Sequence, residues 1–213
     1  RDNRRVNLVN TKEKAEKIVH ELKKLFPQTN TSLEYKTPFQ LLVAVILSAQ
    51  TTDKKVNEVT PKLFAKFKNA WDFANLSQEE LEFYIKSIGL YHAKAKNIIA
   101  AASIISGKYN GELPRTVSEI TVLPGVGRKT ANVVLGIAYG IVEGIAIDTH
   151  VKRLAQLFGL SKSSNPDIIE RDLMAILPKS EWREFTFRMI DYGRAYCPAF
   201  CHHSDCPLRD FII

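Results

Sequence analysis

The chain has 213 residues and a mass of 24.1 kDa, enough for one large domain or two small ones with a proper core. Apolar residues make up 45% and charged residues 25%, which is typical of globular proteins and excludes a disordered chain. The excess of 30 basic over 23 acidic residues gives a net charge of +7, which favours a polyanion as partner without identifying it.

Two further features of the composition bear on the compartment. No apolar run approaches the ~18 residues of a membrane span, so we expect no membrane partner. The three cysteines all lie between positions 197 and 206, and an odd, clustered set excludes a secreted disulfide scaffold. We therefore expect an intracellular protein of the cytoplasm or nucleoid, with reduced thiols or a local metal site.

The helical period dominates from the start of the chain. Residues 11–26 place an apolar stripe on one face of a helix that Pro27 ends. Thr37 and Pro38 are typical of an N-cap and a first helical residue, and the segment after them is almost entirely apolar. A helix that is apolar all round is a buried one.

Capping signals predict where later helices begin. Ser77 with Glu80, and Thr116 with Glu119, have the spacing of capping boxes. Each pair precedes one copy of an internal repeat, described below.

The C-terminal third continues the helical pattern. Asn165 and Pro166 open a helix that extends through Leu177, and Ser180 begins another. Strand-like alternation is hard to find, and the one extended stretch, 140–147, is typical of a connection. We predict an all-α protein.

Two segments of the chain resemble each other. IGLYHAKAKNII (88–99) and LPGVGRKTANVV (123–134) align at a constant offset of 35, so that Lys94 falls on Lys129. Each predicts a helix, a tight turn and a second helix, although helix starts can also match by coincidence. Only the second copy carries a Gly-x-Gly turn.

That turn has the character of an anion site. Gly125 and Gly127 flank Val126 immediately before a helix, where backbone N–H groups and the helix dipole favour a phosphate. Arg128 and Lys129 supply positive charge nearby. The spacing fits neither a Walker loop nor a GxGxxG fingerprint. The alternative is a plain interhelical turn that needs glycines.

LPGVGRKTANVV followed by IAIDTH (145–150) resembles the helix-hairpin-helix-Gly/Pro-Asp DNA glycosylases, and within them the endonuclease III family. The segments TPFQLLVAVILSAQTTD (37–53) and IKSIGLYHAKAKNI (85–98) and the cysteine-rich tail follow in that family's order. The resemblance therefore covers nearly the whole chain.

The resemblance implies a fold and an activity. The fold is all-α, with two helical lobes flanking a cleft: a six-helix domain at 32–141, and a second lobe formed by 1–31 and 142–213. The activity is that of a bifunctional DNA glycosylase and abasic-site lyase, which excises oxidised pyrimidines from duplex DNA in base excision repair. The implied partner is double-stranded DNA with a damaged base or abasic site, and we expect a monomer.

Lys129 matches the family's nucleophile. In that family a lysine attacks the sugar C1′ and expels the base, and the resulting Schiff base permits β-elimination. The amine must be neutral to attack, which burial beside a helix N-terminus favours. The alternative is a solvated lysine that contacts a phosphate. Lys94 has the same offset without the Gly-x-Gly turn, so we assign it no chemistry.

Asp148 matches the family's carboxylate, which stabilises oxocarbenium charge and assists proton transfer. A compatible alternative makes Asp148 the N-cap of the helix that follows. Relatives often have one residue fewer between the lysine and this carboxylate, and the extra residue here falls in GIVEG (140–144). His150 continues the motif, with a packed or surface histidine as its alternative.

The resemblance also implies how the duplex is opened. Gln50 would enter the space that the flipped nucleotide leaves, and Leu90 would act as an apolar wedge. Their alternatives are a helix C-terminus and a core leucine. The residues implied to bind DNA are Gln50, Leu90, Gly125, Val126, Gly127, Arg128, Thr130 and His150. Basic residues expected to neutralise the DNA backbone are Lys54, Lys55, Lys94, Lys96, Arg128, Lys152 and Arg153.

The cysteine tail departs from the family. Relatives hold a [4Fe–4S] cluster with Cys-x6-Cys-x2-Cys-x5-Cys, whereas this chain has Cys-x3-Cys-x4-Cys, so the fourth cysteine is missing. Three alternatives stay open: loss of the cluster, a zinc ion, or a cluster with one non-cysteine ligand. A redox-active thiol pair is a further possibility. The zinc ligands would be Cys197, Cys201, Cys206 and either His203 or His202.

No organic cofactor is expected, because the covalent amine does the chemistry. Two rival functions remain. A monofunctional mismatch glycosylase would replace the hairpin lysine and extend the C-terminus. A non-catalytic helix-hairpin-helix DNA-binding protein would share the GVG turn and the basic charge but would not need Asp148.

Overall fold

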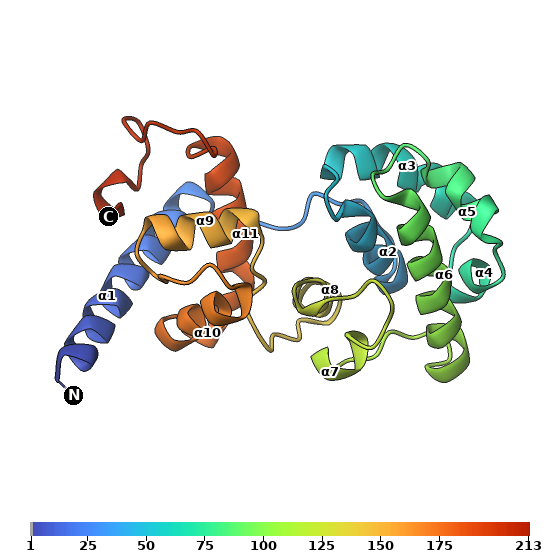
Figure 1. Cartoon of the computed structure of the whole chain (residues 1–213), viewed down its shortest axis with the longest axis horizontal. Coiled ribbons are helices and arrows are strands. Elements are labelled where there is room, and N and C mark those ends of the chain that lie inside the picture. Colours follow the sequence, from blue (N-terminus) through green and yellow to red (C-terminus); the bar gives the residue numbers. More distant parts are fainter. Residues whose placement is uncertain (1) are drawn as a thin grey trace. The chain divides into compact units, whose positions relative to one another are not determined.

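The computed structural model describes residues 2–213, with side chains described from residue 10 onwards. Within this range every regular element is helical, with eleven α-helices and two short 3₁₀ helices, so the all-α prediction is confirmed. No helix among these residues is both long enough and apolar enough to cross a membrane. The chain forms two compact units, shown in Figure 1: a central unit, Ser32–Ile141, and a terminal unit made of the segment up to Thr31 together with Val142–Ile213.

The central unit contains seven α-helices, one more than the six expected, because two of them are very short. They are α2 (Pro38–Ser48), α3 (Asp53–Lys66), α4 (Ala70–Ala74), α5 (Gln78–Ile85), α6 (Tyr91–Lys108), α7 (Val117–Ile120) and α8 (Arg128–Tyr139). Helix α2 packs against α3, α6 and α8 and lies inside the core of the unit.

The buried helix begins as the sequence predicts. Thr37 caps α2, since its Oγ1 accepts a hydrogen bond from the backbone N–H of Gln40 at 3.2 Å, and Pro38 is the first helical residue. All residues from Phe39 to Leu47 are buried. The apolar sequence of α2 is therefore explained by contact with neighbours on every side.

The two similar segments form two helical hairpins, α5–α6 and α7–α8. Leu90 and Gly125, which are equivalent at the offset of 35, both have left-handed backbones, with φ of 57° and 79°. In the second hairpin the N–H of Val126 donates to the carbonyl of Leu123 at 3.1 Å, which closes the turn around Gly125. Helix α6 begins at Tyr91, two positions earlier in the repeat than α8 begins. The structural repeat is confirmed.

The terminal unit joins both ends of the chain. It contains α1 (Asp2–Leu25), α9 (Thr149–Leu157), α10 (Pro166–Ile176), a 3₁₀ helix η1 (Lys179–Glu181), α11 (Trp182–Ala195) and a second 3₁₀ helix η2 (Arg209–Phe211). The predicted face of α1 packs against α10 and α11 through buried residues that include Ile18 and Leu22.

The connection at 140–147 and the start of α11 are the two local features of this unit that the sequence predicted. Residues 140–147 form a connection without strand pairing, as expected, and Thr186 donates a hydrogen bond to the carbonyl of Ala146 at 3.0 Å. Ser180 does not begin α11, because it lies inside η1 and the helix starts at Trp182 without a side-chain cap. The 3₁₀ turn leads directly into α11 and takes the place of a capping residue.

Candidate functional site

The turn before α8 presents its backbone to solvent. Gly125 and Gly127 are exposed, whereas the Val126 side chain is buried in the core of the central unit. A Cβ on Gly125 would lie 3.0 Å from Cβ of Asn97, and its φ of +79° disfavours any other residue. The glycines thus allow the turn to pack closely against α6 while Val126 anchors it.

The N-terminus of α8 has no side-chain cap. Gly127 occupies the capping position, and no acidic residue lies in the first turn. By contrast, Thr37, Thr52, Ser77, Asp148 and Asn165 each accept a backbone hydrogen bond at the start of their helices. The positive end of the α8 dipole is therefore open to an external anion, with Arg128 and Lys129 exposed beside it and Thr130 half-buried.

Lys129 is the second residue of α8 and its side chain is exposed. The expectation that burial favours its neutral amine is therefore wrong for this structure. The buried face of α8 is formed by residues such as Ala131, Val134 and Leu135, and Lys129 lies outside that face.

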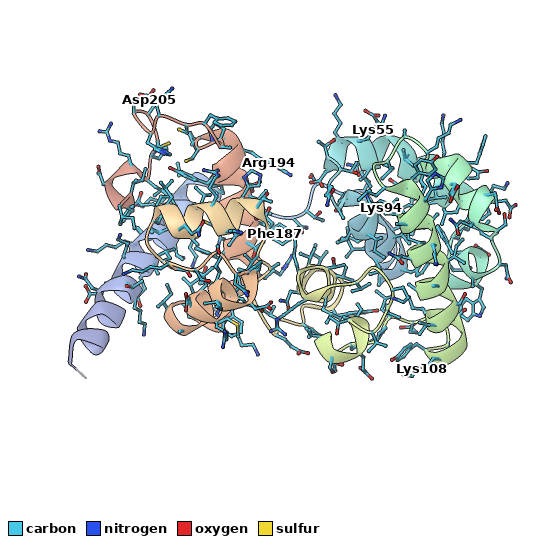
Figure 2. The ribbon with its side chains drawn as sticks, viewed as in Figure 1. Lys55, Lys94, Lys108, Phe187, Arg194 and Asp205 are labelled. Carbon is cyan, nitrogen blue, oxygen red and sulfur yellow. The ribbon has the colours of Figure 1, made fainter. Side chains whose placement is uncertain are left out.

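Lys94, the equivalent lysine of the first hairpin, is only 5% exposed. It extends from α6 to the end of α2 (Figure 2), where Nζ donates to the carbonyls of Leu47 at 2.8 Å and Ala49 at 2.6 Å, and to Thr51 Oγ1 at 3.2 Å. Burial lowers the pKa of Lys94, while its three acceptors match the three donors of an ammonium group.

The structure thus corrects the role predicted for Lys94. It is not available to a DNA phosphate, because it closes the C-terminus of a buried helix. The signal that sequence reasoning missed is its spacing: Lys94 lies four residues before Ile98, on the same helical face as the buried Ala101 and Ile105.

Gln50 and Leu90 lie in neighbouring turns. A Cβ on Gly89 would lie 3.8 Å from the carbonyl oxygen of Gln50 and 3.7 Å from Thr51 Oγ1, so the two turns contact each other. Gln50 is exposed and follows α2 directly, and Leu90 is 62% exposed. Leu90 is therefore not the core residue that its alternative interpretation described.

Both residues also share an uncommon backbone. Gln50 has φ of 55° and Leu90 has φ of 57°, in the left-handed region that side chains other than glycine rarely adopt. The structure therefore brings together two of the predicted DNA-binding residues and holds both in strained conformations.

Asp148 and His150 lie in the terminal unit, at the start of α9. Asp148 is the N-cap, because its Oδ1 accepts a hydrogen bond from the backbone N–H of Val151 at 2.8 Å, which confirms the capping interpretation. His150 packs against α11, where a Cβ on Gly193 would lie 2.5 Å from His150 Nδ1. The half-buried His150 is thus a packed histidine.

The remaining basic residues fall into two groups. Lys54 and Lys96 are exposed, and Lys55 pairs with Glu58 at 2.9 Å. Arg153 differs from the expectation, since its guanidinium donates to the Cys197 carbonyl at 2.5 Å and lies 3.6 Å from Cys197 Sγ. Arg153 is therefore bound to the segment 197–206, the cysteine loop, rather than turned outwards.

The cysteine loop brings four metal-binding side chains together. Among the described residues, the Sγ atoms of Cys197, Cys201 and Cys206 and the Nδ1 atom of His203 all lie within 4.8 Å of one another, so the group can hold a metal ion. His202 is exposed and is not part of the group, which decides between the two histidines left open by spacing.

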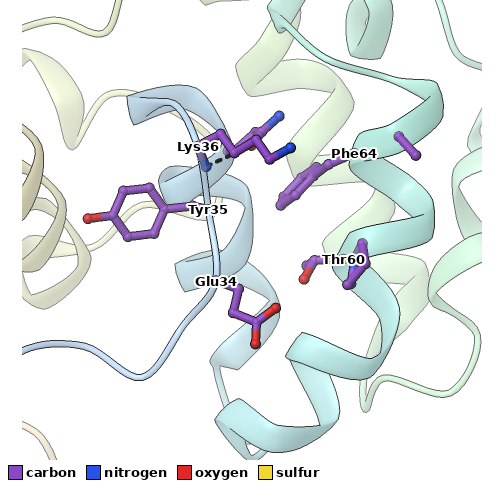
Figure 3. A pocket seen from close by; sticks show the side chains of 8 residues that line it. Glu34, Tyr35, Lys36, Thr60 and Phe64 are labelled. Carbon is purple, nitrogen blue, oxygen red and sulfur yellow. Dashed lines mark hydrogen bonds between the residues drawn. The ribbon is translucent and has the colours of Figure 1, made fainter.

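A pocket of about 270 Å³ lies elsewhere in the central unit. Figure 3 shows Glu34 and Lys36 on the segment before α2, facing Thr60 and Phe64 on α3. The backbone N–H of Lys36 donates to Gln40 Oε1 at 2.9 Å at its edge. None of the predicted site residues lines this pocket, so the pocket is separate from the candidate DNA-binding site.

Comparison with known proteins agrees with this arrangement. Residues 43–179 match the profile of the HhH-GPD superfamily base excision DNA repair proteins. Endonuclease III of Synechocystis is 48% identical over 90% of this chain and 88% of its own, and that of Bacillus subtilis is 45% identical over 86% and 84%.

A solved structure has the same fold. The structure of a trapped endonuclease III–DNA covalent intermediate superposes with a TM-score of 0.90 at 43% identity, over 94% of this chain and 95% of that one. A thermostable thymine-DNA glycosylase, at 22% identity and a TM-score of 0.83, shares the fold. The chain therefore belongs to the endonuclease III family of base excision DNA repair proteins, which are DNA glycosylases with abasic-site lyase activity.

Proposed function

We propose that this chain acts on oxidised pyrimidines and abasic sites in double-stranded DNA, with Lys129 as the nucleophile. The observation that carries the proposal is the exposed Lys129 in the first turn of α8, beside a helix N-terminus without a side-chain cap. Relatives solved as a covalent and a non-covalent endonuclease III–DNA complex support DNA as the partner.

The backbone of the GVG turn would bind a phosphate of the damaged strand. Gly125 and Gly127 expose the turn, and the positive end of the α8 dipole favours the anion. A phosphate held there fixes the register of the strand next to Lys129. Arg128 and Thr130 lie in the same first turn and add charge and a hydroxyl group.

The paired turns of Gln50 and Leu90 would open the duplex. An exposed leucine beside an exposed amide suits the insertion of an apolar wedge and a hydrogen-bonding group into a base stack. Unstacking costs a few kcal/mol per step, so side chains that fill the gap offset part of the cost of base flipping.

The chemistry then needs an amine and a carboxylate. At a damaged nucleotide, neutral Lys129 attacks C1′ and displaces the base, and opening of the C1′–O4′ bond then gives a Schiff base. At an abasic site the amine condenses with the C1′ aldehyde and water is lost, and in both cases the Schiff base acidifies the C2′ proton. Removal of that proton expels the 3′ phosphate by β-elimination. Asp148 would stabilise positive charge on the sugar and move protons to and from the amine, while its Oδ1 caps α9. No organic cofactor is required for these steps.

Borohydride trapping tests the nucleophile. Reduction in the presence of an abasic duplex should give a covalent adduct that is lost in Lys129→Gln and kept in Lys96→Gln, an exposed lysine of α6 that serves as the matched control. With a duplex that carries a damaged base, a monofunctional glycosylase would release the base without any adduct, and a non-catalytic DNA-binding module would give neither. Absence of the wild-type adduct, or its persistence in Lys129→Gln, would overturn the proposal.

Asp148→Asn tests the carboxylate separately from the cap. Asparagine caps helices about as well as aspartate, so the variant should keep its stability within a few tenths of a kcal/mol and should keep DNA affinity. Turnover should fall by at least about 100-fold because the charge is lost. The single-turnover rate of base release, compared between Asp148→Asn and the wild type, measures this effect. An unchanged rate would leave Asp148 with a capping role alone.

We also propose that the protein acts as a monomer inside the cell. A duplex partner with a single damaged nucleotide requires only one set of the residues named above, and the reduced thiols of the cysteine loop suit a reducing compartment. Light scattering of the free protein tests the monomer.

A further inference from the structure

The four side chains of the cysteine loop form a small, compact set of donor atoms. Cys201 Sγ lies 3.3 Å from Cys206 Sγ, and His203 Nδ1 lies 3.5 Å from Cys197 Sγ and 3.7 Å from Cys206 Sγ. A tetrahedral zinc ion, with bonds of about 2.3 Å to sulfur and about 2.0 Å to nitrogen, separates its ligand atoms by about 3.6–3.8 Å. The three edges of 3.3, 3.5 and 3.7 Å lie near these values, and the other edges are no longer than 4.8 Å.

The same distances do not fit an iron–sulfur cubane. A [4Fe–4S] cluster places an iron atom behind each ligand, so its cysteine sulfurs stand about 6 Å apart. Here all four donor atoms lie within 4.8 Å of one another, and one of the four is an imidazole nitrogen. The loop would have to open on every side to admit the cluster.

Charge around the site is balanced for one divalent ion. Three thiolates and a neutral imidazole around Zn²⁺ leave a net charge of −1, after three thiol protons pass to solvent. The Arg153 guanidinium lies 3.6 Å from Cys197 Sγ and supplies the opposite charge from α9. The backbone N–H of His203 donates to Cys201 Sγ at 3.3 Å, which further stabilises a thiolate.

The backbone at His203 is also unusual. Its φ of 63° lies in the left-handed region, where a histidine is strained. This conformation directs His203 towards the thiols while its neighbour His202 stays exposed. The strain is thus located at the residue that completes the set of four.

We propose that Cys197, Cys201, His203 and Cys206 bind a single zinc ion in place of the iron–sulfur cluster of the family. The ion would hold the segment between α11 and η2 against the terminal unit, since Cys197 and Cys206 are buried in that unit's core. The site is closed by four protein ligands, so its role is structural and leaves the chemistry at Lys129 unchanged.

Metal analysis of the full chain, purified without oxygen, tests the proposal. We expect one zinc per chain, no acid-labile sulfide and no iron–sulfur absorption in the visible region. Co²⁺ added to the chelator-treated protein should give the intense bands of a tetrahedral thiolate site. Iron with equimolar sulfide would overturn the proposal, as would a single iron without sulfide, or a metal-free chain whose Tm responds to neither zinc nor chelator.

Variants locate the ion. His203→Ala should weaken zinc affinity by at least about tenfold, and the matched control His202→Ala, one position away and exposed, should not. Because His203→Ala can fail to fold, His203→Cys provides a second measurement: it should fold, bind zinc, and increase the thiolate-to-Co²⁺ absorption. Equal zinc affinity in both alanine variants would contradict the assignment. Borohydride trapping on the same preparations reports the chemistry at Lys129 independently.

Discussion

Leu90 combines two features that a stable fold would normally avoid. It is a large apolar side chain that is 62% exposed, and its φ of 57° is one that leucine rarely adopts. Such a conformation costs about 1–3 kcal/mol and persists where the surrounding structure enforces it, often at functional sites. The equivalent residue of the second hairpin is Gly125, which adopts the same region without that cost. The leucine is thus better explained by contact with a ligand than by stability.

Leu90→Gly should separate these two effects. The backbone strain is relieved and little buried surface is lost, so the free energy of unfolding should stay level or rise by about 1 kcal/mol. The kcat/KM for lesion excision should fall at least about tenfold, because the proposed apolar wedge is missing. This fall corresponds to about 1.4 kcal/mol of activation free energy. Chemical denaturation and lesion-excision kinetics measure the two quantities.

Asn110→Gly is the matched control. Asn110 is exposed and has φ of 49°, but it lies in the loop after α6, away from both hairpin turns. Its replacement should affect stability in the same direction and leave excision unchanged. A loss of stability in Leu90→Gly together with full activity would contradict the role assigned to Leu90.

At the scale of elements, the two hairpins use equivalent lysines for different purposes. Helix α6 starts two positions earlier than α8 relative to the repeat, so Lys94 is the fourth residue of its helix and Lys129 the second of its own. Two residues rotate a side chain by about 200° around a helix axis. One lysine therefore faces the core and fixes the turn that carries Gln50, and the other faces solvent.

Lys94→Met should show this supporting role. The carbonyls of Leu47 and Ala49 would lose their donor at the end of α2, which costs about 1–3 kcal/mol for buried groups left unpaired. DNA affinity should also fall, because the turn carrying Gln50 is no longer fixed. Lys96→Met, on the exposed side of the same helix, should change the free energy of unfolding by no more than about 0.5 kcal/mol. Equal effects of the two substitutions would show that the contacts of Lys94 are unimportant.

Local features of this chain could be predicted from the sequence, whereas features that depend on tertiary packing could not. Start signals such as Thr37–Pro38 and the Ser77 capping box are local, so the helices beginning there were predictable and are found. The burial of Lys94 depends on which face of α6 meets α2. Its spacing to Ile98 and Ile105 indicated that face, whereas its alignment with Lys129 did not. Arg153 and His203 were likewise resolved only by packing, since adjacent residues such as His202 and His203 have almost the same spacing to the cysteines.

At the scale of the whole molecule, the terminal unit depends on both ends of the chain. Leu22 of α1 is fully buried among residues of α10 and α11. Lys14 Nζ donates to the carbonyl of Phe158 at 3.0 Å, and Thr29 Oγ1 donates to Asp191 at 2.6 Å. The N-terminal segment is therefore an integral part of the core that the C-terminal helices form.

Leu22→Ala should destabilise one unit selectively. Removing a buried leucine costs about 2–5 kcal/mol, and amide hydrogen exchange should accelerate in α9, α10 and α11 more than in α2 to α8. Leu81→Ala, at a fully buried position of α5, should give the reverse pattern. Uniform acceleration across the whole chain in both variants would show that the two units unfold together.

The discontinuous build of the terminal unit also sets an order of events during translation. The central unit is complete in sequence at Ile141, whereas α11 begins at Trp182, 157 positions after α1 ends at Leu25. At about 5–20 residues per second, the ribosome needs roughly 8–30 s to cover that distance. During this interval the central unit can fold on its own, while the apolar face of α1 waits for α10 and α11. The apolar face of α1 therefore lacks its packing partners until α10 and α11 have been synthesised.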